Sequence, residues 1–219
     1  MDFRKHLAQC VPYTGKVLID ETDYLEGLAE KWRIALPTES KERLFAFVSR
    51  MMEWNARINL TGAKSRDELV SEHLVDSFAM TYFLPGACTV ADVGAGGGLP
   101  GVPLAILRPD ISLAMVEPRA KRVAFLRSVT HELGLRNSLI HRCRCDDLRA
   151  TFDVSASRAT FPPEEWLRVG RGLVRVGGSV LLFANQDWSA VDPSVPLRDS
   201  VSYTTGSGRP RWMGAFCFT

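Results

Sequence analysis

A run of glycines in the middle of the chain most constrains its fold. Segment 92–101 reads Asp-Val-Gly-Ala-Gly-Gly-Gly-Leu-Pro-Gly; it overlaps the end of an apolar run at 89–93 and precedes a predicted short helix over 103–107. A strand, a glycine loop and a helix in this order form the cofactor-binding corner of a doubly wound α/β sheet. Glycine suits such a loop because a Cβ would keep the backbone away from the ligand and would disfavour a positive φ.

The spacing of the glycines separates cofactor classes. A dinucleotide fingerprint has glycine at its first, third and sixth positions, and Leu99 stands at the sixth position here. The loop does not end in a lysine followed by Ser or Thr, which excludes a phosphate-cradling P-loop. The remaining pattern, Gly94, Gly96 and Gly98, suits a cofactor without a pyrophosphate.

Acidic residues follow the next two predicted strands. Glu117 comes directly after the apolar run 112–116. A carboxylate at this strand end accepts hydrogen bonds from ribose hydroxyls. After a third predicted strand over 139–142, Asp146 is either placed to reach an adenine amino group or belongs to an aspartate pair that starts a helix.

The hydrophobic pattern divides the chain into two parts. Residues 24–83 carry apolar side chains at helical spacing, whereas 89–185 alternates short apolar runs with amphipathic stretches. Alternation of this kind predicts a mainly parallel sheet with helices on both faces. We therefore expect a helical extension over 1–85 and a Rossmann-like α/β domain over 86–219. The predicted helices cover 38–52, 67–82, 103–107, 119–133 and 164–174, with a connector at 54–62; the later strands cover 152–156 and 179–183, and 201–219 forms an edge hairpin.

Composition narrows the class of protein. A hydrophobic share of 46% and a charged share of 24% are ordinary for a soluble globular protein. No apolar run approaches the ~18 residues of a membrane span, and the N-terminus lacks the apolar region of a secretory signal. The five scattered cysteines include no C-x-x-C pair, which favours a reducing cytoplasm over disulfides or a zinc site. A net charge of +2 implies that any contact with nucleic acid is local.

Several short motifs together resemble one protein family. The most distinctive are Asn59-Leu60-Thr61 and His73-Leu74-Val75-Asp76-Ser77. With the other segments, they make the sequence similar to the bacterial 16S ribosomal RNA guanine-N7 methyltransferases, the glucose-inhibited division protein B family. The matching segments are 54–55, 58–61, 73–77, 92–101, 107–109, 121–127, 132–135, 152–153 and 157–159.

The resemblance implies a class I methyltransferase fold with an N-terminal helical extension. It also implies S-adenosylmethionine as cofactor and 16S ribosomal RNA as partner, either as free RNA or within the small ribosomal subunit, with no metal and no membrane. By position, the pocket for cofactor and target would be lined by Gly94, Leu99, Cys145, Asp146 and Arg158, of which Arg158 is the most substrate-directed.

The C-terminal third departs from the family pattern. The chain has Phe183-Ala184-Asn185-Gln186 where the family shows Lys-Gly, and its final strand lacks the usual basic ending. Two other functions therefore stay open: a methyltransferase acting on a non-RNA substrate, and a non-catalytic protein that binds cofactor or ribosome. A nicotinamide-dependent oxidoreductase is disfavoured by Leu99 at the sixth loop position.

Individual residues also keep a structural alternative. Arg158 is expected to orient a guanine or hold a phosphate, and its structural alternative is a surface ion pair at a strand end. His73 and Asp76 lie one helical turn apart, and we favour a structural pair that packs the helical part onto the glycine loop.

Overall fold

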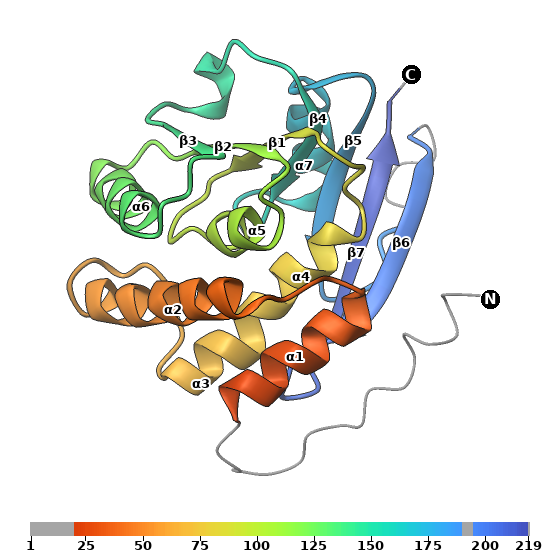
Figure 1. The fold of residues 1–219 in the computed structure, drawn as a ribbon. Helices are drawn as coiled ribbons and strands as arrows, with labels where there is room; N and C mark the ends of the chain where they lie inside the picture. The colour runs from red at the N-terminus through yellow and green to blue at the C-terminus, as the bar shows by residue number, and fades with distance from the viewer. Residues whose placement is uncertain (1–19, 190–194, 219) are drawn as a thin grey trace.

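The computed structural model describes residues 20–189 and 195–218, and it is built around one seven-stranded sheet (Figure 1). The strand order is β3-β2-β1-β4-β5-β7-β6. The first five strands run parallel to their neighbours, whereas β7 lies antiparallel between β5 and β6. The strands are β1 Thr89–Val93, β2 Ser112–Val116, β3 Ser138–His141, β4 Phe152–Ser157, β5 Val174–Ala184, β6 Leu197–Thr204 and β7 Pro210–Cys217.

Helices cover both faces of the sheet, as the alternating sequence predicted (Figure 1). One face of the sheet is covered by α5 and α6, and α1, α2 and α4 form a further layer beyond these two helices (Figure 1). On the opposite face, α7 packs against β4 and β5. The helices are α1 Glu21–Trp32, α2 Thr38–Ile58, α3 Arg66–Leu69, a π-helix Val70–Leu74, α4 Val75–Thr81, α5 Gly101–Leu107, α6 Ala120–Glu132 and α7 Pro163–Arg171.

The central strands are buried on both faces, which explains their continuous apolar runs. Successive residues of β1 point to opposite sides, so Val90 belongs to the larger core and Ala91 to the smaller one around Trp166. The larger core also contains side chains of α1, α2 and α4. The helices before the sheet therefore share one core with it.

The structure differs from the predicted elements in three segments of the helical pattern. The predicted connector 54–62 is helical as far as Ile58, where α2 ends, and Asn59 caps the helix with a φ of 48°. The predicted helix 67–82 contains a π-helical turn at Val70–Leu74. The predicted helix 164–174 ends at Arg171, and Val174 already pairs with Phe152 in the sheet, because backbone pairing across an irregularity in β4–β5 overrides the local helical pattern.

Two predictions for the sheet are confirmed. Strand β2 has its predicted bounds, and the C-terminal hairpin β6–β7 lies at the edge of the sheet. In the part of the chain that the structure describes, no helix is long and apolar enough to cross a membrane.

Candidate cofactor and substrate site

The predicted site residues lie where the parallel strands of the sheet end, which we call the carboxyl edge. Strands β1, β2, β3 and β4 are mutually parallel, so their carboxyl ends meet there. The glycine loop follows β1, and Glu117 follows β2. The turn with Cys145 and Asp146 comes after β3, and Arg158 comes directly after β4.

The glycine loop adopts the conformation for which its sequence is suited. Gly94, Gly96 and Gly98 have φ values of +74°, +56° and +82°, a region that side chains disfavour. The amides of Gly94 and Ala95 donate to the Val116 carbonyl over 2.8 and 3.1 Å, which ties the loop to the end of β2. Leu99, just beyond, is partly buried against the larger core.

Glu117 contacts the glycine loop directly. Its side chain is buried, and Oε2 accepts a hydrogen bond of 3.0 Å from the Gly96 amide. Oε1 accepts one of 2.9 Å from the Arg119 amide, and Arg122 Nη1 lies 3.8 Å from Oε2. A carboxylate oxygen accepts more than one hydrogen bond, so both oxygens keep capacity for ribose hydroxyls. The structure thus brings Glu117 and the loop together as predicted.

Asp92 is a candidate site residue that was not among the residues predicted from the sequence. It is 1% exposed, and its Oδ2 has no hydrogen-bond partner among the described residues. Burial raises the pKa of this carboxyl to about 7, against a lowering hydrogen bond from the Gly101 backbone. A buried, unpaired acceptor beside the glycine loop fits a donor or a cation supplied by a bound molecule. Its position at the head of the glycine segment was the signal available in the sequence.

The helical part covers the glycine loop from the other side. A Cβ on Gly97 would lie 3.0 Å from the Leu60 carbonyl oxygen, so the two backbones pack closely. The Ser77 hydroxyl donates to the Pro100 carbonyl over 3.1 Å. The Asn-Leu-Thr and His-x-x-Asp-Ser motifs are therefore both in contact with the loop or its flank.

Arg158 contacts side chains of the π-helix and α4, which precede the sheet in the chain. Its Nε lies 2.6 Å from Asp76 Oδ2, and the Arg158 and Asp76 side chains are 18% and 2% exposed. Its Nη2 donates to His73 Nδ1 over 2.8 Å. The ion pair that Arg158 forms therefore has a buried partner and is not the surface pair considered as an alternative, and His73 and Asp76 both face Arg158.

The loop after β4 also reaches the glycine loop. A Cβ on Gly94 would lie 2.3 Å from the Thr160 hydroxyl, which itself donates to the Arg158 carbonyl over 3.3 Å. Thr160 was not predicted, because only the fold brings it beside Gly94.

Cys145 and Asp146 lie in a single 3₁₀ turn, Cys145–Asp147, after β3. The Cys145 thiol donates to Asp146 Oδ1 over 3.7 Å, and burial raises the pKa of that thiol. Among residues 20–189 and 195–218, no group of three or more His, Cys, Asp or Glu side chains is arranged to hold a metal ion.

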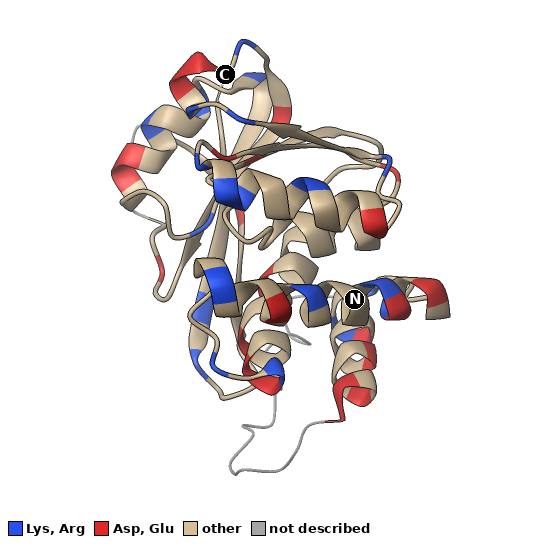
Figure 2. Ribbon diagram, turned by 90° about the vertical axis from the view of Figure 1, so that its left-hand side faces the viewer, with Lys and Arg blue, Asp and Glu red and all other residues tan. Residues whose placement is uncertain are grey.

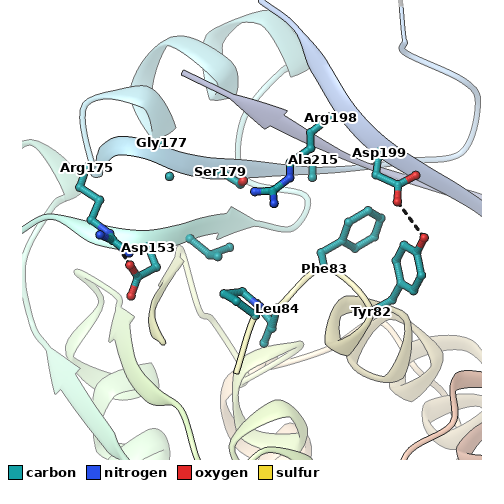
Figure 3. A pocket seen from close by; sticks show the side chains of 13 residues that line it. Tyr82, Phe83, Leu84, Asp153, Arg175, Gly177, Ser179, Arg198, Asp199 and Ala215 are labelled. Atoms are coloured by element: carbon teal, nitrogen blue, oxygen red, sulfur yellow. Dashed lines mark hydrogen bonds and ion pairs between the residues drawn. The ribbon is translucent and has the colours of Figure 1, made fainter. Parts of the chain in front are cut away.

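A separate cavity of about 540 Å³ lies at the end of the sheet opposite the carboxyl edge, where the parallel strands β4 and β5 begin (Figure 3). None of the predicted site residues lines it. Arg175 pairs there with Asp153, Tyr82 donates to Asp199 over 2.7 Å, and Arg198 points into the hollow (Figure 3). The sequence-predicted site is therefore the carboxyl edge, not this cavity.

Comparison with known proteins agrees with this architecture. The family described as rRNA small subunit methyltransferase G matches residues 40–189. The ribosomal RNA small subunit methyltransferase G of Halorhodospira halophila is 37% identical over 159 residues, which cover 72% of this chain and 76% of that protein. The protein of the same name from Wolinella succinogenes is 38% identical over 163 residues, covering 74% and 84%.

Solved structures show the same fold at low sequence identity. An O-methyltransferase from Bacillus cereus, in complex with SAH, has a TM-score of 0.56 at 15% identity and covers 78% of this chain and 90% of that one. An O-methyltransferase from Klebsiella pneumoniae, described as putative, has a TM-score of 0.54 at 16% identity, covering 79% and 90%. The sheet with its glycine loop is the class I methyltransferase fold.

Proposed function

The chain belongs to the rRNA small subunit methyltransferase G family, and from this premise we propose that it transfers a methyl group from S-adenosylmethionine to N7 of a guanine in 16S ribosomal RNA. The observation that carries the proposal is the family match over 40–189, which includes both the glycine loop and Arg158. The chain's two departures from the family pattern, at 183–186 and in the last strand, include no residue of the glycine loop and do not include Glu117.

The residues at the carboxyl edge fit the proposed cofactor. Glu117 would accept the ribose hydroxyls, Cys145 and Asp146 would face the adenine, and Gly94, Gly96, Gly98 and Leu99 would line the remainder. The unpaired Oδ2 of Asp92 suits the cationic methionine portion. When bound, S-adenosylmethionine supplies an electrophilic methyl group on a sulfonium.

The main requirement of this reaction is that the protein aligns the methyl donor and the acceptor. Guanine N7 has a lone pair and no proton, so the transfer requires no general base. Holding donor and acceptor in line at near contact is worth on the order of 7–11 kcal/mol of the barrier. Arg158, fixed beside the cofactor loop, would orient the guanine through O6 or hold a flanking phosphate. A contact to a phosphate, unlike one to O6, keeps the guanidinium away from the positive charge that develops on the ring.

The RNA contact is expected to be local. Lys and Arg segments are interspersed with Asp and Glu segments over most of the ribbon (Figure 2), and the net charge is only +2. A few phosphates near the carboxyl edge would therefore be bound, either on free 16S RNA or on the small ribosomal subunit in the cytoplasm. We keep 1–85 as a helical extension and 86–219 as the methyltransferase domain in this proposal.

The deciding experiment supplies methyl-labelled S-adenosylmethionine together with small ribosomal subunits that lack the modification. The RNA is then digested to nucleosides, and the label is expected in 7-methylguanosine. Label in another nucleoside would overturn the N7 assignment. Absence of label from RNA, with the cofactor still bound, would favour one of the alternatives, a different substrate or a non-catalytic binding role.

A further inference from the structure

A chain of hydrogen bonds connects the C-terminal hairpin to Arg158. Tyr203, in β6, donates its hydroxyl to Asp76 Oδ1 over 2.8 Å. The other oxygen of the same carboxylate, Oδ2, lies 2.6 Å from Arg158 Nε. Tyr203 and Asp76 are both buried, so water does not compete for these contacts. The Asp76 carboxylate thus bridges the hairpin and the arginine.

The guanidinium of Arg158 is held at two of its three nitrogens. Nε faces Asp76, and Nη2 donates to His73 Nδ1 over 2.8 Å. Two anchors fix the plane of a guanidinium, whereas one leaves it free to rotate. Neither of these two contacts uses Nη1, which leaves this group to a ligand at the carboxyl edge.

The hairpin reaches Arg158 because of its register. Strand β7 runs antiparallel to β5, and Trp212 pairs with Ala184 at the carboxyl end of β5. The β6–β7 turn therefore lies at the same edge as the glycine loop. The turn is fastened to the π-helix, since the Gly206 amide donates to the Ser71 carbonyl over 2.9 Å and the Ser207 amide to Glu72 Oε1 over 2.9 Å.

We propose that Asp76 and Tyr203 are positioning residues that fix the guanidinium of Arg158 for contact with the RNA substrate. The proposal rests on the proposed function, because it assumes that Arg158 contacts the substrate. Tyr203 holds the plane of the carboxylate, and the carboxylate holds the plane of the guanidinium. Tyr203 also lies beyond the family match at 40–189, so that match does not account for this part of the site.

The test removes one hydroxyl and compares it with a matched control. Tyr203→Phe is expected to lower kcat on small ribosomal subunits about three- to tenfold, the fold-change corresponding to one net hydrogen bond. The Kd for S-adenosylmethionine and the KM for RNA should stay within about twofold. The control is Tyr82→Phe, which also removes a tyrosine–aspartate hydrogen bond, the 2.7 Å bond to Asp199. Asp199 lies in β6, as Tyr203 does, but at the end of the sheet opposite the carboxyl edge. Its kcat should equal that of the wild type.

A second measurement needs no substrate. The Nε–H of Arg158, observed by nitrogen-15 NMR, should exchange slowly with water in the wild type and in Tyr82→Phe. It should exchange faster in Tyr203→Phe and fastest in Asp76→Asn, which keeps the side-chain shape and removes the charge. Unchanged exchange in both of these variants, or a kcat of Tyr203→Phe equal to that of Tyr82→Phe, would overturn the positioning role. A wild type that methylates no RNA would instead overturn the proposed function, and the exchange rates would still decide the positioning.

Discussion

His73 lies in a place that accepts only its neutral form. Its Nδ1 receives the hydrogen bond from Arg158 Nη2 over 2.8 Å, so the ring proton is on Nε2. Burial and the neighbouring charge of Arg158 lower the pKa of His73 to about 4. A second proton would remove the acceptor and would bring two cations into contact.

The lowered pKa of His73 makes the stability of the fold depend on pH. In the unfolded chain a histidine takes up a proton near pH ~6.5, whereas folded His73 does so only near pH 4. The unfolded state therefore binds more protons between these values, and stability falls as the pH is lowered through this window. His73→Asn, which keeps an acceptor near the place of Nδ1, should lose less stability than the wild type between about pH 7.5 and about pH 5 in urea unfolding.

The pH dependence of the wild type alone does not isolate His73, because Asp92 changes the stability with pH in the opposite direction. Its pKa is raised to about 7 in the folded protein, so its contribution to stability is lost as the pH rises through this value. Asp92 is unchanged in His73→Asn, and the difference between the two proteins isolates the histidine. Equal pH dependence in both proteins would show that His73 is not the group responsible.

Gly94 combines two requirements that only glycine meets. Its φ is +74°, and a Cβ would lie 2.3 Å from the Thr160 hydroxyl. Gly94→Val is therefore expected to weaken S-adenosylmethionine binding at least about tenfold, or ~1.4 kcal/mol, in isothermal titration calorimetry. Gly62→Val is the control, because Gly62 has open space around its Cβ position and no positive φ. Retained affinity in Gly94→Val would remove the glycine loop from the cofactor site.

At the scale of elements, local pattern predicted the strands better than the helix before them. Residues 67–82 have helical periodicity throughout, yet the structure contains the π-helix Val70–Leu74. The Ser71 carbonyl within it accepts hydrogen bonds of 2.9 Å from both the Gly206 amide and the Tyr24 hydroxyl. These partners are far away in the sequence, so no local pattern could have indicated the π-helical turn. Turns of this kind are frequent at functional sites.

The contact between the hairpin turn and the π-helix leaves no room for a side chain at Gly206. A Cβ there would lie 2.6 Å from the Ser71 Cβ. Gly206→Ala should lower the free energy of unfolding by about 1–3 kcal/mol, the usual effect of overpacking, in urea titrations. The matched variant Gly27→Ala, in α1 with open space around it, should instead raise stability by up to about 1 kcal/mol. A neutral Gly206→Ala would mean that the turn moves away from the π-helix at little cost.

At the scale of the whole molecule, the sequence predicted the glycine loop, the place of Glu117 after the next strand and the strand–helix alternation of the parallel part, because each is specified by residues close in the chain. It did not predict the environment of Arg158. That environment combines the π-helix and α4, the end of β4 and the β6–β7 hairpin, including Tyr203. Only the packing of distant segments creates it, and the paired contacts are absent from any single motif.

The same packing bears on the division at residue 85. Helices α5 and α6 lie against α2 and α4, and Val102 and Leu104 of α5 are completely buried in the core that they share with Phe47 and Phe78. Removing residues 1–85 would expose this apolar face to water, at about 25 cal/mol for each Å² uncovered. We therefore expect the boundary to separate two parts of one cooperative unit.

The fragment 86–219 is accordingly expected to lack a fixed fold, with poorly dispersed amide resonances and little protection from hydrogen exchange. The full chain should unfold in a single transition, with equal calorimetric and van 't Hoff enthalpies. Adding fragment 1–85 in excess should restore dispersion and S-adenosylmethionine binding, because Leu60 and Ser77 then cover the glycine loop again. A fragment 86–219 that folds and binds the cofactor alone would establish it as an independent domain, and the helical part would then serve the RNA, not the fold.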